Sequence, residues 1–213
     1  MTRPQIALVL HAVVLIAAMI FIVPALTGTF GGPRGYLLSL AVYWLGFCLP
    51  VFFWHIRGRH GPRLFSESLA WRDWFVPGLL LLQVGTITLI AFVPNTAMLT
   101  TQAAMLGGVV ALIHAPLEET AWRGGFLTRF ADRPRLGFVL GWALFTAWHA
   151  PLALSHDMVF DGGWMALVGG AGALGLLWSW IAWRTGSVFW VLIAHALTNA
   201  VTFWVLFDRN GLP

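Results

Sequence analysis

Seven apolar runs alternate with short polar segments along the chain. Each run is close to the roughly 20 residues that an α-helix needs to cross a bilayer. The pattern therefore predicts an all-α fold, a polytopic transmembrane helix bundle of about seven helices. The runs cover residues 5–26, 36–56, 74–93, 101–130, 136–154, 163–183 and 187–207.

The composition supports this class of fold. Hydrophobic residues make up 59% of the 213 residues and charged residues only 9%, and the mean hydropathy is +0.82. These values are typical of a membrane protein and exclude an ordinary soluble domain. No linker or low-complexity tract separates two parts, so we expect a single integral membrane domain over residues 1–213. The first run is too long for a secretory signal and is expected to be retained.

The basic residues predict an orientation in the membrane. All 12 are arginines, and the loops 94–100 and 155–162 contain none. With a cytoplasmic N-terminus, only Arg34 and Arg209 fall on the outer side, which is a strong positive-inside bias. The ten on the cytoplasmic side are Arg3, Arg57, Arg59, Arg63, Arg72, Arg123, Arg129, Arg133, Arg135 and Arg184.

The same distribution bears on partners and location. The isoelectric point of about 10.6 reflects arginines that flank spans, so we expect the lipid bilayer as a partner and no nucleic acid. Arginine without lysine, together with abundant Gly and Ala, is typical of a GC-rich prokaryotic genome. We therefore expect an integral protein of a prokaryotic inner (plasma) membrane.

A few polar residues interrupt the later apolar runs. Glu118 and Glu119 stand in one run, His149 in the next, and His195 with Asn199 in the last. Ionisable side chains inside a span are costly and usually have a partner or a function. Along each helix, these residues lie roughly 16–22 Å from the arginine that marks its cytoplasmic end. They therefore share one layer of the membrane. Such a layer of carboxylates, imidazoles and an amide is a candidate catalytic site.

The spacing suggests separate roles. Glu119 and Arg123 are four residues apart and can form an ion pair on one helix face, which leaves Glu118 free for chemistry. His195 and Asn199 share a face in the same way, and Phe145 lies one turn before His149. A purely structural interpretation is also open, because polar side chains often join helices by hydrogen bonds. His114, one turn before Glu118, could join the site, but we interpret it as a packing residue.

Three motifs resemble one family. Glu118-Glu119-x-x-x-Arg123, Phe145-x-x-x-His149 and His195-x-x-x-Asn199 occur in order, as in the CAAX protease and bacteriocin-processing (CPBP, or Abi) family. That family includes the Ras-converting CAAX prenyl endopeptidase. The resemblance covers about 100–205, the motif-bearing core.

The resemblance implies an intramembrane endopeptidase. Glu118 and His149 would activate a water, and His195 and Asn199 would form the oxyanion hole. Glu119, Arg123 and Phe145 would support the site. The substrate would be a peptide or protein, prenylated or not. No His-Glu-x-x-His zinc motif occurs, so we expect no metal and no cofactor, although Glu118, His149 and His195 together could bind zinc.

Two other classes of function fit the residues. A non-proteolytic membrane scaffold or bacteriocin-immunity-type protein could keep every motif as structure. A proton-coupled carrier is the third hypothesis, since intramembrane Glu and His also form proton relays. The chain shows no paired broken helices of inverted repeats, which disfavours the carrier.

Overall fold

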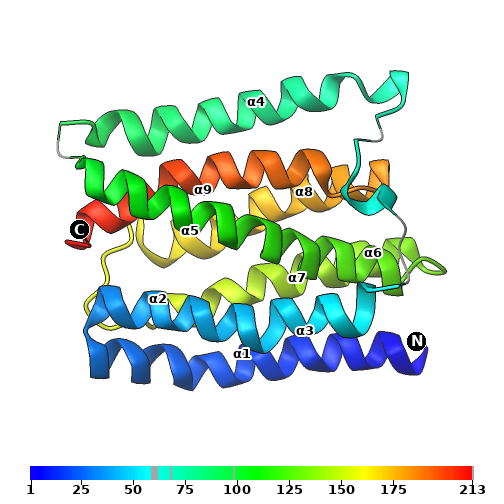
Figure 1. Cartoon of the computed structure of the whole chain (residues 1–213), viewed down its shortest axis with the longest axis horizontal. Coiled ribbons are helices and arrows are strands. Elements are labelled where there is room, and N and C mark those ends of the chain that lie inside the picture. Colours follow the sequence, from blue (N-terminus) through cyan, green and yellow to red (C-terminus); the bar gives the residue numbers. More distant parts are fainter. Residues whose placement is uncertain (59–61, 68, 98, 213) are drawn as a thin grey trace.

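The computed structural model describes residues 1–58, 62–67, 69–97 and 99–212, without the side chains of residues 62 and 63. Arg59 and the side chain of Arg63, both used in the orientation argument, lie outside the described residues. Helices alone make up the regular structure of the described ranges, and seven helical segments run along one long axis (Figure 1). The prediction of an all-α bundle of about seven helices is confirmed.

Several segments contain more than one kind of helix. The single-type segments are α1 (Arg3–Phe30), α7 (Pro134–Leu152) and α9 (Phe189–Arg209). The others join α-helices to short π or 3₁₀ turns: α2 (Gly32–Tyr43) with η1 (Trp44–Cys48), α3 (Leu49–Val51) and η2 (Phe52–Ile56); η4 (Trp71–Asp73) with α4 (Phe75–Ile87), η5 (Thr88–Phe92) and η6 (Val93–Asn95); α5 (Thr101–Glu119) with η7 (Thr120–Gly124) and α6 (Gly125–Arg129); and η8 (Met165–Gly169) with α8 (Gly170–Thr185). A short 3₁₀ turn, η3 (Pro62–Phe65), lies between the second and third segments.

Five segments are long and apolar enough to cross a membrane: Arg3–Phe30, Gly32–Ile56, Trp71–Asn95, Met165–Thr185 and Phe189–Arg209. The remaining two, from α5 to α6 and α7, contain the buried glutamates and His149. Polar side chains lower the mean hydropathy of these two segments. The least apolar segments of the bundle are therefore those that hold most of the candidate site.

The helices are layered so that the motif-bearing ones lie inside. Helices α1 and α2 lie along one side of the bundle, α4 lies along the opposite side, and α5 and α9 run between them (Figure 1). The two termini lie at opposite ends, as an odd number of spans requires (Figure 1).

The first two helices form a tight hairpin. Thr2 caps α1 through a capping box with Gln5. Gly31 connects α1 to α2 with a φ of 81°, a conformation that other residues rarely adopt. A Cβ on Gly35 would lie 2.4 Å from the Leu26 carbonyl oxygen, so the close return of α2 onto α1 depends on glycine there.

Helices α5 and α9 are antiparallel and pack closely. At Gly107, an added Cβ would lie 2.8 Å from the Trp204 backbone nitrogen. Small residues at such positions let two helix backbones approach in a membrane bundle. Because Glu118 and His195 lie further along the same pair of helices, this contact also sets the width of the candidate site.

We expect Gly107→Ala to lower the melting temperature in detergent. The new methyl group would meet the α9 backbone, and overpacking of this kind typically costs about 1–3 kcal/mol. Gly108→Ala is the matched control, because an added Cβ there meets nothing within 4 Å and has the same effect on helix propensity. Equal melting temperatures for the two variants would contradict the close α5–α9 contact.

Candidate active site

The two glutamates lie side by side at the end of α5, where the π turn η7 begins. Both side chains are fully buried. π turns inside helices often occur at functional sites, because the extra residue changes which side chains face inward. Here Trp122 and Arg123, both in η7, also point into the bundle and are buried.

Glu118 has more partners than the sequence suggested. Its Oε1 atom accepts hydrogen bonds from the Tyr43 hydroxyl at 2.8 Å and from the Trp148 indole at 3.0 Å. The Trp122 indole in turn donates to the Tyr43 oxygen at 2.6 Å. The spacing of the motifs gave no partner for Glu118, but aromatic donors from α2 and α7 converge on its Oε1 atom.

The other oxygen of Glu118 faces two imidazoles. The Nε2 atoms of His114 and His195 lie 3.1 and 3.5 Å from Oε2. Within the described part of the chain, Oε2 makes no hydrogen bond of good geometry. One carboxylate oxygen is thus fixed by aromatic donors, and the other is left for proton transfer.

Glu119 joins two helices. Its Oε1 atom accepts from Arg123 at 3.0 Å, the pair that the spacing predicts, and from Nδ1 of His195 on α9 at 2.6 Å. The bond to His195 was not foreseen. Because a carboxylate oxygen can only accept, Nδ1 of His195 carries a proton. The other ring nitrogen, Nε2, lies 3.5 Å from Oε2 of Glu118.

Arg123 is held on several sides. Its guanidinium donates to Ser179 at 3.3 Å and to the Gly175 carbonyl at 3.4 Å, both on α8, and lies 3.9 Å from the centre of the Phe145 ring. A Cβ on Gly175 would lie 2.7 Å from Phe145. Glycine at this position therefore lets α8 approach closely enough to reach the arginine.

A chain of side chains orients His195 from the side of α4. The Trp178 ring stacks on the imidazole with centroids 4.2 Å apart. The Trp178 indole donates to the Gln83 side-chain oxygen at 3.3 Å, and the Gln83 amide donates to Thr198 at 3.0 Å. Gln83 thus links α8 to α9 directly behind the catalytic candidate.

His149 is held in one tautomer. Its Nδ1 atom lies 2.9 Å from the Phe145 carbonyl oxygen, which can only accept, so Nδ1 carries the proton. The Phe145 ring meets the imidazole edge to face at 4.8 Å. The Nε2 atom of His149 is therefore an acceptor, as a water-activating imidazole requires.

These residues border one large cavity of about 640 Å³. Glu118, His149, His195 and Asn199 all line it, and His114 does too. The Nδ2 atom of Asn199 is buried and has no hydrogen-bond partner within the described residues, so this donor is available to a molecule in the cavity. Most of the remaining lining is apolar and comes from α4, η5, α8 and α9.

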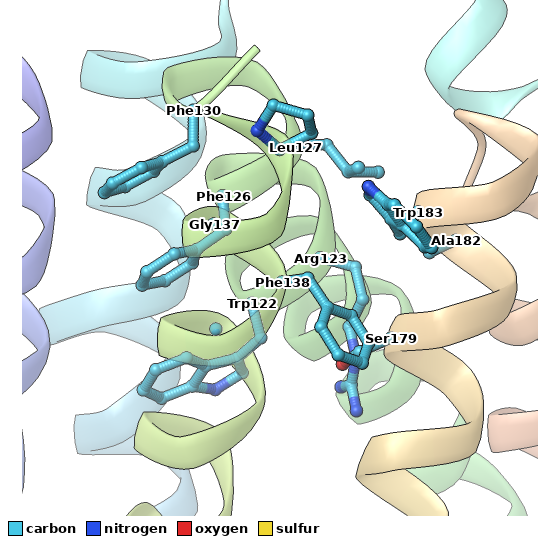
Figure 2. A pocket seen from close by; sticks show the side chains of 12 residues that line it. Trp122, Arg123, Phe126, Leu127, Phe130, Gly137, Phe138, Ser179, Ala182 and Trp183 are labelled. Atoms are coloured by element: carbon cyan, nitrogen blue, oxygen red, sulfur yellow. The ribbon is translucent and has the colours of Figure 1, made fainter. Parts of the chain in front are cut away.

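A second cavity is far smaller, about 30 Å³. Arg123 and Ser179 lie beside each other in its wall, among the aromatic rings of Phe126, Phe138 and Trp183 (Figure 2). It has room for about one water. It is too small for a peptide, whereas the large cavity, which the motif residues line, is the candidate substrate site.

His114 was interpreted as a packing residue, but the structure places it in the site. It is buried, lines the cavity, and lies beside Glu118. In the described ranges, His114, Glu118 and His195 offer three ligand atoms within 4.8 Å of one another. The trio that the sequence suggested for zinc, with His149 in place of His114, is not the one that the fold brings closest together.

Comparison with protein families agrees with the motifs. Residues 100–201 match the model of the type II CAAX prenyl endopeptidase Rce1-like family. This part of the chain is Rce1-like. No curated protein and no solved structure matches the chain. The resemblance of this segment to the CAAX protease family is thereby confirmed, and the five long apolar helices indicate an integral membrane protein.

Several residues of the Rce1-like site escaped the motif analysis. Tyr43, Trp44 and Gln83 come from helices before the matched segment. One signal could have pointed to α2: the chain has only two tyrosines, Tyr36 and Tyr43, which are seven residues apart and so share one helix face. Tyr36 lines the cavity and Tyr43 binds Glu118.

The buried charges of the Rce1-like site are partly compensated. Arg123 neutralises Glu119, and buried carboxylates need such compensation because the bundle interior cannot solvate them. Glu118 has two imidazoles beside it, since the Nε2 atoms of His114 and His195 lie 3.1 and 3.5 Å from its Oε2 atom.

We expect Arg123→Gln to destabilise the protein strongly. Removing one partner of a buried ion pair leaves an unpaired charge and typically costs about 3–5 kcal/mol. Arg133→Gln is the matched control, since Arg133 pairs with Asp132 at 3.7 Å with both side chains about half exposed and exposed pairs contribute about 0.2–1 kcal/mol. The measurement is the melting temperature in detergent. Similar shifts for both variants would argue against a structural role for the buried pair.

Proposed function

We propose that the protein is an intramembrane endopeptidase of the CAAX type that uses a metal-independent, glutamate-activated water. The observation that carries this proposal is the convergence of Glu118, His149, His195 and Asn199 on the wall of one cavity of about 640 Å³. The four residues come from three helices, and no requirement of packing alone explains why all four border the same space.

Glu118 is the proposed general base. Tyr43 and Trp148 hold its Oε1 atom, so Oε2 can accept a proton from water. The Nε2 acceptor of His149 would orient that water from another side of the cavity. General-base assistance of this kind typically contributes about 10²–10⁴-fold to the rate.

His195 and Asn199 are the proposed oxyanion donors. When the water oxygen bonds to the scissile carbonyl carbon, negative charge moves to the carbonyl oxygen. The unpartnered Nδ2 atom of Asn199 and a protonated Nε2 of His195 would stabilise that charge by hydrogen bonds. Glu119 supports this role because its bond to Nδ1 of His195, 2.6 Å long, fixes the orientation of the imidazole ring.

The proton balance follows from these roles. The proton removed from water moves to Glu118. It is then transferred to the amide nitrogen as the carbon–nitrogen bond breaks, and the products are a carboxylic acid and an amine. Glu118 is returned to its starting state, so one glutamate serves first as base and then as acid.

The cavity also supports a peptide substrate that carries a prenyl group. Its wall on α4, η5, η8 and α8 is apolar, with Ile87, Ile90, Leu167 and Leu174 among the lining residues. A prenyl chain lying there would gain about 25 cal/mol for each Å² of apolar surface removed from water. The polar residues of the site would then act on the peptide beside it.

We also propose that residues 1–213 act as one membrane domain with a cytoplasmic N-terminus, in a prokaryotic inner membrane. Tyr43 on α2 and Gln83 on α4 contact the Rce1-like core, which supports a single unit. The arginine asymmetry supports the orientation.

Hydrolysis of a quenched-fluorescent peptide by purified protein in detergent tests the function, with prenylated and unprenylated forms of one sequence. We expect the wild type to cleave the prenylated form better. Glu118→Gln, His149→Ala and His195→Ala should abolish cleavage, and Asn199→Ala should reduce it by about 10²–10³. His156→Ala is the control, because His156 lies in the exposed loop after α7. Wild-type turnover by Glu118→Gln would refute the base, and a wild type that cleaves neither peptide would favour the scaffold hypothesis.

A separate prediction concerns the effect of metal removal on activity. If Glu118 and His149 activate water directly, a strong chelator should leave the rate unchanged. Purified active protein should also contain no stoichiometric zinc by elemental analysis. Loss of activity with a chelator and its recovery on addition of zinc would overturn the metal-independent mechanism.

A further inference from the structure

Trp44 makes a contact that no motif explains. Its indole nitrogen lies 3.0 Å from Nδ1 of His114. An indole N–H can only donate, so Nδ1 of His114 must accept. The imidazole of His114 therefore carries its proton on Nε2, and it cannot be doubly protonated while this hydrogen bond exists.

The surroundings of His114 are otherwise suited to a divalent metal ion. Two ligands about 2.1 Å from a tetrahedral zinc ion lie roughly 3.4 Å apart. Oε2 of Glu118 is 3.1 Å from Nε2 of His114 and 3.5 Å from Nε2 of His195. All three ligand atoms are buried and within 4.8 Å of one another, so the spacing of a three-ligand site is already present.

His195 also meets the geometric requirement of a metal ligand. Its Nδ1 atom donates to Glu119 at 2.6 Å, which leaves a lone pair on Nε2 when the ring is neutral. A carboxylate that accepts from the second nitrogen is the usual partner of a metal-binding histidine. Glu118 and His195 are thus ready to bind a metal, and His114 is the ligand that differs.

We propose that Trp44 keeps this site closed to metals by fixing the tautomer of His114. With a proton on Nε2, His114 presents N–H to Glu118 in place of a lone pair. A metal at Nε2 would require the proton to move to Nδ1, where it would meet the Trp44 N–H. Trp44 is in this sense a positioning residue that leaves Oε2 of Glu118 available to water.

Replacement of Trp44 should open the site. In Trp44→Phe, Nδ1 of His114 can carry the proton, and we expect Co²⁺ and Zn²⁺ to bind about 10- to 100-fold tighter, the range found for changes in the partners of metal ligands. Titration of the purified full-length protein with Co²⁺ should produce the intense visible absorption of a tetrahedral site in Trp44→Phe and not in the wild type. Trp71→Phe is the matched control, because Trp71 is 88% exposed.

A second variant and a second measurement keep the proposal falsifiable. Trp44→Phe combined with His114→Phe should lose the gained Co²⁺ affinity. Imidazole ¹⁵N spectra of histidine-labelled wild type should show His114 with its proton on Nε2, and this signature should change in Trp44→Phe. Equal Co²⁺ affinity in the wild type and Trp44→Phe, retained affinity in the double variant, or an Nδ1-protonated His114 in the wild type would each overturn the proposal.

An activity measurement extends the test to catalysis, and this part alone rests on the proposed function. Zn²⁺ bound at Oε2 of Glu118 would block the base, so Zn²⁺ should inhibit Trp44→Phe and a chelator should restore it, while the wild type remains unaffected. If the wild type were inactive, the proposed function would fail while the Co²⁺ titration would still decide the role of Trp44. Tighter Co²⁺ binding without Zn²⁺ inhibition in an active Trp44→Phe would contradict the assignment of Oε2 as the base.

Discussion

Two adjacent carboxylates inside an apolar helix bundle form the constraint on which the rest of the structure depends. Neither Glu118 nor Glu119 is exposed, and an uncompensated buried charge is unfavourable by several kcal/mol. Arg123 and His195 compensate Glu119, and Tyr43 and Trp148 donate to Glu118. These donors come from α2, η7, α7 and α9, so the four elements must all approach the end of α5.

The close helix contacts follow from that requirement. A guanidinium can donate to α8 only if α8 comes near, and Gly175 removes the side chain that would prevent it. A histidine on α9 can reach a glutamate on α5 only if the two backbones approach, and Gly107 allows this. The geometry of the candidate site and the packing of the bundle therefore depend on the same contacts, so a variant that changes one is expected to affect the other.

The site also shows how one carboxylate can be both stable and reactive. Oε1 of Glu118 is held by two aromatic donors, while Oε2 faces the cavity with imidazoles beside it. Hydrogen bonds to a charged group contribute about 1.5–3 kcal/mol each, enough to fix the side chain without occupying Oε2, the proposed proton acceptor. In the same way, the Trp44 indole donates to Nδ1 of His114. The Nε2 atom of His114 then carries a proton and is a hydrogen-bond donor, not a metal ligand.

The sequence by itself determined the class of fold, the number of helices and the family, because apolar length and motif spacing are local properties of the chain. It also predicted the Glu119–Arg123 pair, since residues four apart are neighbours on a helix whatever surrounds it. It did not predict that Glu118 has partners, that Glu119 binds His195, or that His114 belongs to the site. His114 is four residues before Glu118, so the spacing permitted that contact without requiring it. The other contacts join residues 30 to 76 positions apart, and only the packing of whole helices decides which side chains meet across the bundle.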